Sequence, residues 1–463
     1  MDLSSFAGYS IANQLFNTVQ VQMDVAGNNI SNASNPAYSQ QAAVVQPAPP
    51  LADVSGVGEV GGGSEVASIQ RQRDTYVDAQ RVATQGQLGE SSTLAQGLNQ
   101  LQGVLNESNG QGISNTLNQL TSAFASLAAQ PSDPSLRAGV VDAASTAAGA
   151  INQEYSSLAS LRQQADQQAS QAVGQMNSTA QSVAALNVQI ANAQAAGQQP
   201  NDLMDQRQAD LETLGTLAGA DSTTMANGMV SVNVNGHWLV DQGTSASVST
   251  AQDPLNPAVS SFTWADNGQA FSPAGGEAQG ALTLRDQDVA GAMGNLNTLA
   301  ASLVADYNGL QSTGYALGAA TPGGSAFFTG TGASTIAVDP ALAANPSALA
   351  AAQNPSAPGD GTNATAFAAL ADKASAGLGT TYTGALSTWT SEVGASAALA
   401  TQQQTTQQSS MTQLNNLTSS VSGVDLNEQA ISLSEYQQAY EAGAHYVGTL
   451  DQMMQSLISE ITG

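Results

Sequence analysis

The C-terminal segment carries an apolar stripe that a long helix would align on one face. Along residues 426 to 461, positions separated by alternating steps of four and three are apolar except at Gln437 and Asp451. This alternation averages about 3.5 residues, the period of helices that pack along their length in coiled coils. At about 1.5 Å per residue, such a helix would be about 54 Å long. The stripe therefore predicts a long amphipathic helix that needs a partner.

The N-terminal segment carries a similar stripe. Apolar residues recur there at the same steps, at Ile11, Leu15, Val19, Met23, Ala26 and Ile30. We expect this helix to end near Asn28 and Asn29, ahead of the turn-forming residues 31–36. Periodicity does not identify the partner of either stripe. The two ends could pair within one chain, or they could form an interface that neighbouring copies complete.

The interior alternates between helical and strand patterns. Residues 113–127 and 176–190 have apolar stripes at helical spacing, and so do residues 289–310 and the segment that begins at Tyr382. Between them, alternating valines lead into Asn235 and Gly236, a pair typical of a two-residue hairpin turn. The predicted fold class is α+β. Both chain ends form a long helical hairpin or coiled-coil bundle, and a β-rich domain is inserted in the middle.

These patterns divide the chain into six expected parts. The outer parts are N-terminal and C-terminal inner-core helices, the first followed by a loop with short strands. Between them we expect two halves of a long helical domain, a β-rich middle domain, and a helical return with loops and short strands. In chain order the boundaries are 1–70, 71–220, 221–280, 281–362, 363–420 and 421–463.

The composition excludes several classes of partner. The chain has 35 Asp and Glu against 8 Lys and Arg, a formal net charge of −27, and no cysteine. Phosphate binding needs clustered basic residues, so we expect no nucleic-acid partner, and an anionic membrane surface would repel the chain. No apolar run reaches the roughly 18 residues of a membrane-spanning helix. Because no basic segment opens the chain, we expect no Sec-type signal peptide; if the protein leaves the cell, it is exported without a cleaved signal peptide.

Catalytic and ligand-binding patterns are weak. Residues 56–61 match G-x-G-x-x-G, but prolines precede them and further glycines follow, so a flexible loop is the better interpretation. His237 and His445 are the two histidines, and their spacing supplies no nucleophile or further metal ligand. Asp286 and Asp288 fit a helix start, where acidic residues are favourable. We expect no catalytic residue, cofactor or metal site, and we interpret the chain as a non-enzyme.

Two motifs at opposite ends resemble those of the bacterial flagellar axial proteins, the rod, hook and hook-associated proteins. Residues 27–41 read Gly-Asn-Asn-Ile-Ser-Asn-Ala-Ser-Asn-Pro-Ala-Tyr-Ser-Gln-Gln. Residues 422–430 read Ser-Gly-Val-Asp-Leu-Asn-Glu-Gln-Ala, and residues 436–440 read Tyr-Gln-Gln-Ala-Tyr. The interior segments 68–74, 201–207 and 280–286 resemble the members of this family that form the hook–filament junction.

The resemblance implies a structural role in flagellum assembly. It implies self-assembly into a junction ring or helical layer between the hook protein and hook-associated protein 3. It also implies delivery by a flagellar export chaperone and the type III export apparatus to the extracellular flagellum. Together with the stripes, it gives an expected assembly interface of Leu15, Val19, Met23, Asn28, Asn29, Ile30, Tyr38, Leu426, Leu433, Tyr436, Tyr440, Val447, Met454, Ile458 and Ile461.

Two alternatives remain open at this point. The chain could be another flagellar axial protein, such as hook-associated protein 3 or a hook subunit, although the interior segments argue against this. It could also be an axial scaffold whose middle domain has a carbohydrate-binding or enzymatic activity. Trp238 and Trp264 could then stack on sugars, although packing on a strand face is the more common role.

Overall fold

The chain forms two compact units, each assembled from segments that are far apart in the sequence. The computed structural model describes residues 3–50, 61–105 and 112–462, with side chains from Ala7 to Glu460 within these ranges. The terminal unit consists of Met1–Gly86, Gln175–Ser247 and Gln408–Gly463. The central unit consists of Gln87–Gly174 and Val248–Gln407. Both chain ends therefore belong to the terminal unit.

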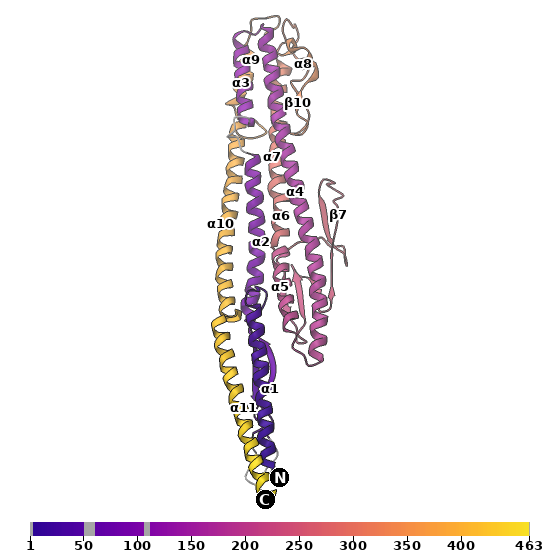
Figure 1. The fold of residues 1–463 in the computed structure, drawn as a ribbon. Helices are drawn as coiled ribbons and strands as arrows, with labels where there is room; N and C mark the ends of the chain where they lie inside the picture. The colour runs from indigo at the N-terminus through magenta and orange to yellow at the C-terminus, as the bar shows by residue number, and fades with distance from the viewer. Residues whose placement is uncertain (1–2, 51–60, 106–111, 463) are drawn as a thin grey trace. The chain divides into compact units, whose positions relative to one another are not determined.

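Most of the described residues are helical, and the strands are short (Figure 1). The helices are α1 (Leu3–Asn32), α2 (Thr75–Val104), α3 (Ile113–Ala129), α4 (Pro134–Ala195), α5 (Asn201–Ala218), α6 (Gly276–Thr283), the π-helical turn η2 (Leu284–Asp288), α7 (Val289–Thr313), α8 (Pro340–Ala344), η3 (Pro346–Ala348), α9 (Thr362–Ala368), η4 (Ala369–Ala371), α10 (Tyr382–Ser422) and α11 (Leu426–Thr462). The strands are β1 (Gln41–Pro47), β2 (Ser64–Arg71), β3 (Asp221–Thr224), β4 (Val230–Val234), β5 (His237–Asp241), β6 (Thr244–Ser245), β7 (Val248–Gln252), β8 (Ser260–Trp264), β9 (Phe328–Thr329) and β10 (Ala337–Val338).

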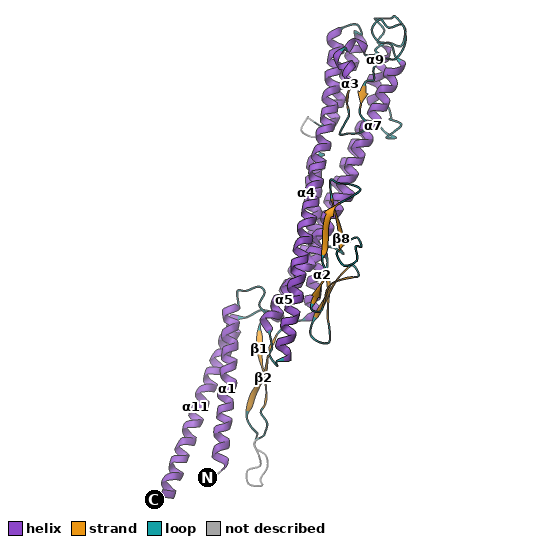
Figure 2. Ribbon diagram, turned by 90° about the vertical axis from the view of Figure 1, so that its right-hand side faces the viewer, coloured by secondary structure: helices purple, strands orange, loops and turns teal. Residues whose placement is uncertain are grey.

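The predicted fold class is confirmed. The chain is mostly helical with small antiparallel sheets in its middle, and α1 and α11 pack side by side (Figures 1 and 2). The expected end of the first helix is wrong by about one turn, because α1 continues to Asn32. Two side chains hold that last turn. Ser31 Oγ donates to the Gly27 carbonyl (2.8 Å), and Asn32 Nδ2 donates to the Asn28 carbonyl (3.0 Å).

The sheets of the terminal unit are antiparallel. Strands β1 and β2 form a hairpin that pairs Gln41 with Arg71. Strands β3 to β6 form a meander, and Asn235 (φ 48°) and Gly236 (φ 89°) make the turn between β4 and β5. This confirms the hairpin predicted from the Asn-Gly pair, which tolerates positive φ at both positions. Asn187 on α4 holds the meander, because its Nδ2 donates to the Val230 carbonyl (2.7 Å).

The core of the central unit is built around Phe124 on α3. Its ring stacks on Phe367, with centroids 4.5 Å apart, and also lies near Tyr307 and Phe327. The whole predicted stripe of α3 is buried: Ile113, Leu117, Leu120, Phe124 and Leu127. The prediction that these residues form one apolar helix face is therefore confirmed, and that face is part of the core.

Residues 276–313 form one continuous helical run, α6–η2–α7. The expectation that Asp286 and Asp288 stand at a helix start is therefore wrong, since both lie in the π-helical turn η2. In that turn Arg285 pairs with Asp166 (2.5 Å) and Asp286 (2.7 Å). Asp166 also accepts from the backbone N–H of Ser260 (2.8 Å), which attaches β8 to α4.

Replacing Phe124 with alanine should destabilise the central unit strongly, because the ring is fully buried among other aromatic side chains. We expect the free energy of unfolding to fall by about 3–5 kcal/mol, the usual cost of removing a core aromatic side chain. Ser126→Ala, on the exposed side of the same helix, is the control and should change it by less than about 0.5 kcal/mol. Chemical denaturation of the full chain measures both. Equal effects would contradict the placement of this core.

Candidate assembly interface

The N-terminal motif folds around the buried side chain of Asn29, which is 1% exposed. Its Nδ2 donates to the Gln41 carbonyl (2.9 Å) and to Gln429 Oε1 (3.0 Å). Its Oδ1 accepts from the Gln41 N–H (3.0 Å) and from the Tyr38 hydroxyl (2.7 Å). An amide side chain has two donor hydrogens and two acceptor lone pairs. All four are used, so no polar group of Asn29 is left unpaired.

These bonds join the two terminal motifs. Asn29 lies on α1, Gln41 opens β1 and Gln429 lies in the first turns of α11. Nearby, the Gln40 N–H donates to the Ser422 carbonyl (2.9 Å) at the end of α10. Asp425 then caps α11, because its Oδ1 accepts from the Asn427 N–H (2.8 Å), as acidic residues do at helix starts. Gln41 and Gln429 lie within the two terminal motifs, but the sequence alone predicted no role for either residue.

The hydroxyl of Tyr38 serves this centre as a donor. Burial, together with the negative charges of Asp202 and Asp205, raises the pKa of Tyr38 to about 12. The phenol is therefore protonated at neutral pH and can donate to Asn29. Asn28, by contrast, is exposed, and its Nδ2 stands 3.4 Å from the Tyr38 oxygen. Of the motif residues expected at the interface, Asn29 is thus hydrogen-bonded within the chain, and Asn28 faces solvent.

Helices α1 and α11 approach closely along their length. The rings of Phe16 and Tyr440 lie 4.8 Å apart between centroids. Gly443 faces the same contact, where a Cβ atom would stand 2.9 Å from Leu15 Cδ2. Nearer the chain ends, the Tyr9 hydroxyl donates to Asp451. A side chain at Gly443 would therefore require the ends of the Leu15 and Phe16 side chains to shift.

The expected interface residues differ in how far the chain itself covers them. On α1, Val19 is buried and Leu15, Met23 and Ile30 are half-buried. On α11 the half-buried members are Leu433, Tyr436, Val447 and Met454, and the exposed ones are Leu426, Tyr440 and Ile458. The side chain of Ile461 lies outside the described residues.

Helix α11 keeps a large uncovered apolar surface. Ile431, Met453 and Ile458 are 61%, 62% and 56% exposed. No large apolar side chain described on α11, up to Glu460, is fully buried. A single partner helix covers one stripe of an amphipathic helix. These exposed apolar side chains make α11 the candidate interface of the terminal unit.

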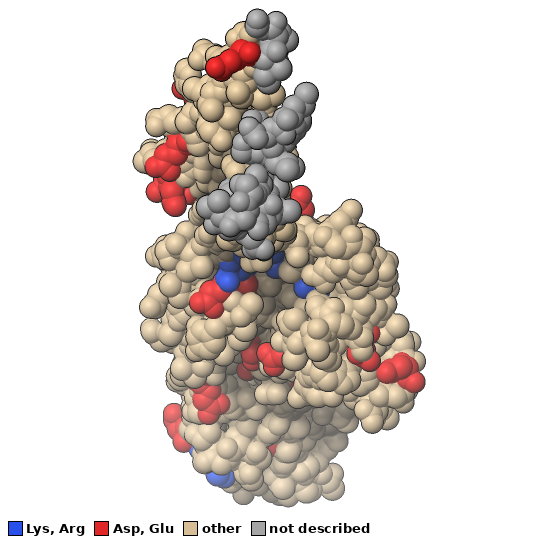
Figure 3. Space-filling model, turned by 90° about the horizontal axis from the view of Figure 1, so that it is seen from below, with Lys and Arg blue, Asp and Glu red and all other residues tan. Residues whose placement is uncertain are grey.

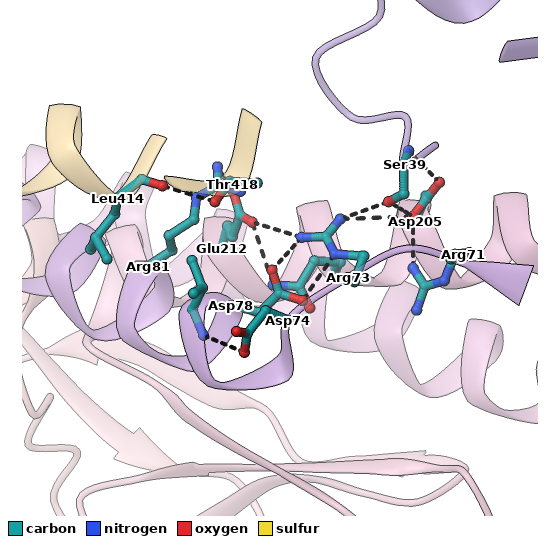
Figure 4. Close-up of polar contacts among 12 residues, drawn as sticks. Ser39, Arg71, Arg73, Asp74, Asp78, Arg81, Asp205, Glu212, Leu414 and Thr418 are labelled. Carbon is teal, nitrogen blue, oxygen red and sulfur yellow. Dashed lines mark hydrogen bonds and ion pairs between the residues drawn. The ribbon is translucent and has the colours of Figure 1, made fainter. Parts of the chain in front are cut away.

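An ion-pair network attaches the β1–β2 hairpin to α2 and α5. One face of the molecule shows acidic side chains scattered among uncharged residues, with few basic ones (Figure 3). In the terminal unit, Arg71, Arg73 and Arg81 lie among acidic partners in one network (Figure 4). There Asp205 on α5 accepts from Arg71 (2.6 Å) and from the Ser39 hydroxyl (2.6 Å). Arg73 pairs with Asp78 at 2.5 Å. In the sequence these arginines look scattered, and no local signal predicted their network.

Of the two sugar-stacking candidates, Trp238 on β5 is 48% exposed, whereas Trp264 on β8 is buried. Trp264 is buried edge-on against Phe271, which makes it unavailable for stacking on a sugar. His445 is exposed on α11, and most of the glycine-rich segment 56–61 lies outside the described residues. The described part of the chain brings no three His, Asp or Glu side chains into a group that could hold a metal ion. Across residues 3–50, 61–105 and 112–462, none of the helices combines the length and hydropathy needed to cross a bilayer.

Two protein-family models match the chain. The model described as the helical domain of the flagellar hook-associated protein FlgK matches residues 98–328. The model described as the C-terminal part of the flagellar basal body rod FlgEFG protein matches residues 418–460. The second match contains the C-terminal motif and most of α11, and the first contains the interior segments 201–207 and 280–286.

Known proteins agree with these matches. The chain is 26% identical over 245 residues to flagellar hook-associated protein 1 of Bacillus subtilis, covering 50% of this chain and 48% of that protein. It is 26% identical over 312 residues to the protein of the same name from Salmonella typhimurium, covering 65% and 55%. The chain thus spans about half the length of these relatives. The solved structure of the flagellar hook junction protein FlgK from Burkholderia pseudomallei shares the fold, with a TM-score of 0.65 at 18% identity, covering 74% of this chain and 100% of that one.

Replacing Asn29 with alanine should loosen the join between the chain ends. The Gln41 and Gln429 groups would lose their buried partner, and each such loss costs about 1–3 kcal/mol. We expect the free energy of unfolding of the terminal unit to fall by about 3 kcal/mol, and amide exchange at Gln41 to become faster. Asn28→Ala, at the exposed neighbouring position, is the control and should cost less than about 1 kcal/mol. Similar losses for both variants would show that Asn29 does not hold the ends together.

Proposed function

We propose that this chain, which belongs to the family of the flagellar hook-associated protein FlgK, is a structural subunit of the junction between the hook and the filament of the bacterial flagellum. The observation that carries the proposal is the apolar surface of α11, which α1 leaves uncovered. The α1–α11 pair serves as one strut, and neighbouring copies cover the remaining apolar side chains when the struts assemble side by side.

The geometry supports an inner layer made of paired terminal helices. The hydrogen bonds of Asn29 fix the register of α1 against α11 before assembly, so less ordering is required when copies associate. Burial of Ile431, Met453 and Ile458 between copies then supplies the driving force. The expected interface residues on α11 lie on both its covered and uncovered sides, which suits a helix that contacts its own chain and a neighbour at once.

The proposed partners follow from this position. The hook protein would adjoin the layer on one side and hook-associated protein 3 on the other. The subunit would reach the extracellular flagellum through the type III export apparatus, with an export chaperone covering the apolar surface of α11 on the way. Such a cover is physically reasonable, because an exposed apolar surface promotes premature association.

Deletion of the gene in its own host tests the proposed role. We expect electron microscopy to show hooks without filaments, and we expect filament protein to accumulate in the medium, because filament subunits would find no junction to build on. Return of the gene on a plasmid should restore the filaments. Complete absence of hooks would place the protein earlier, in the rod or hook, and normal filaments would contradict the junction role.

Met453→Asp tests the uncovered side of α11 directly. Met453 is exposed in the single chain, so the stability of the chain should not change. Assembly should fall at least about tenfold, because a carboxylate would be buried between copies. Sedimentation of the purified chain and filament formation in a complemented deletion strain measure this. Gln452→Asp, which adds the same charge at the adjacent exposed position, is the control. Normal assembly of Met453→Asp would exclude this side as the interface.

A further inference from the structure

The terminal unit contains a cavity of about 240 Å³ that is lined by three arginines, Arg71, Arg73 and Arg207. We call it the arginine cavity. The chain has only 8 basic residues against 35 acidic ones, so three guanidinium groups around one cavity are a marked local concentration of positive charge. Among the described lining residues, Asp78 is the one carboxylate. The site belongs to β2, the start of α2, α5 and the β3–β4 hairpin.

Arg207 carries a charge that the described part of the chain does not neutralise. It is 6% exposed, and its Nη1 donates to Asn187 Oδ1 (2.9 Å) and to the Gly228 carbonyl (3.0 Å). Both acceptors are uncharged. Burial, and to a smaller extent the positive charge of Arg71, lowers the pKa of Arg207 to about 10. The guanidinium is still protonated at neutral pH, so a buried cation remains without a counter-ion.

The neighbouring ion pairs do not supply a counter-ion for Arg207. Arg71 is paired with Asp205 (2.6 Å), Arg73 with Asp78 (2.5 Å), and Arg81 with Glu212 (2.9 Å). Each of these three arginines has a carboxylate partner, whereas Arg207 has none among the described residues. A buried charge is normally retained with a partner, since an unpaired ion in the interior is costly. An anion in the cavity would complete the network.

The remaining lining favours an oxyanion. The cavity is also lined by Thr75, Ser222 and Thr224, which carry hydroxyl groups, and by Gln194 and Gln208, which carry side-chain amides. Such groups can donate hydrogen bonds. Guanidinium groups bind carboxylate and phosphate through paired N–H donors. We propose that the arginine cavity is an oxyanion-binding site that takes a phosphate ion or a carboxylate. The source would be either the free ion or an acidic side chain of a second copy of the chain.

Thermal unfolding of the full chain tests binding. Sodium phosphate, compared with sodium chloride at equal ionic strength and pH 7, should raise the unfolding midpoint by about 2 °C or more when the site is saturated. Arg207→Gln should abolish this shift. Arg162→Gln, which removes an arginine of the central unit, is the control and should keep the shift. No shift for the wild-type chain would exclude the free ion.

A pair of variants at Ser222 tests whether the cavity favours an anion even if Arg207→Gln does not fold. Ser222→Glu places a carboxylate in the cavity, and Ser222→Gln fills similar space without charge. We expect Ser222→Glu to unfold at a higher temperature than Ser222→Gln in chloride, and to show no response to phosphate. Equal midpoints for the two variants would mean that the cavity does not favour an anion, and the proposal would be wrong.

Self-association of the purified chain separates the two sources. If an acidic side chain of a second copy enters the cavity, Ser222→Glu should weaken association about tenfold and phosphate should compete with it. If the ligand is the free ion, phosphate should stabilise the chain and Ser222→Glu should associate like the wild type. Absence of both effects would overturn the proposal. Met453→Asp should lose assembly but keep the rise of the unfolding midpoint in phosphate. Failure of the oxyanion-site proposal is therefore distinguishable from failure of the proposed function.

Discussion

The terminal unit depends on the buried side-chain amide of Asn29. Its partners are a backbone group 12 residues away and a side chain 400 residues away, and every hydrogen-bonding position is filled. Apolar contact between α1 and α11 is not directional, so by itself it would allow one helix to slide along the other. A buried amide that is satisfied in one arrangement penalises every other register. The two chain ends are thus held by hydrophobic contact and aligned by a polar centre.

The arginines of the chain make their contacts inside it. In the terminal unit, arginines fasten the β1–β2 hairpin to α2 and α5. In the central unit, Arg285 ties η2 to α4, and Arg137 is buried with carbonyl oxygens as acceptors, its Nε 2.7 Å from the Pro131 oxygen. Burial lowers the pKa of Arg137 accordingly. With its arginines engaged internally, a chain of net charge −27 presents a largely acidic and uncharged exterior. Association between copies must therefore rest on apolar contact and on the few places where positive charge is left unpaired.

The long helices and the hairpin turn were predictable because their signals are local. Helical period alone identified the stripe around Phe124, and turn chemistry alone identified Asn235 and Gly236. The contact of Asn29 with Gln429 has no such signal, since polar residues without a period meet across 400 residues. For the candidate interface, the stripe located α11, but the rotation of α11 about its own axis decides which members α1 covers. Gly443 and the Phe16–Tyr440 contact lie where α1 meets α11 in that rotation, and the stripe gave neither Gly443 nor Phe16 a place.

The incomplete cover of α11 has a physical use. A helix that its own chain buried on all sides would have no apolar surface left to join copies. A helix with no partner would order only on association, and the loss of conformational entropy would oppose assembly. Here α1 covers part of the apolar surface of α11, while Ile431, Met453 and Ile458 stay exposed. Pairing within the chain and association between copies therefore use different side chains of the same helix.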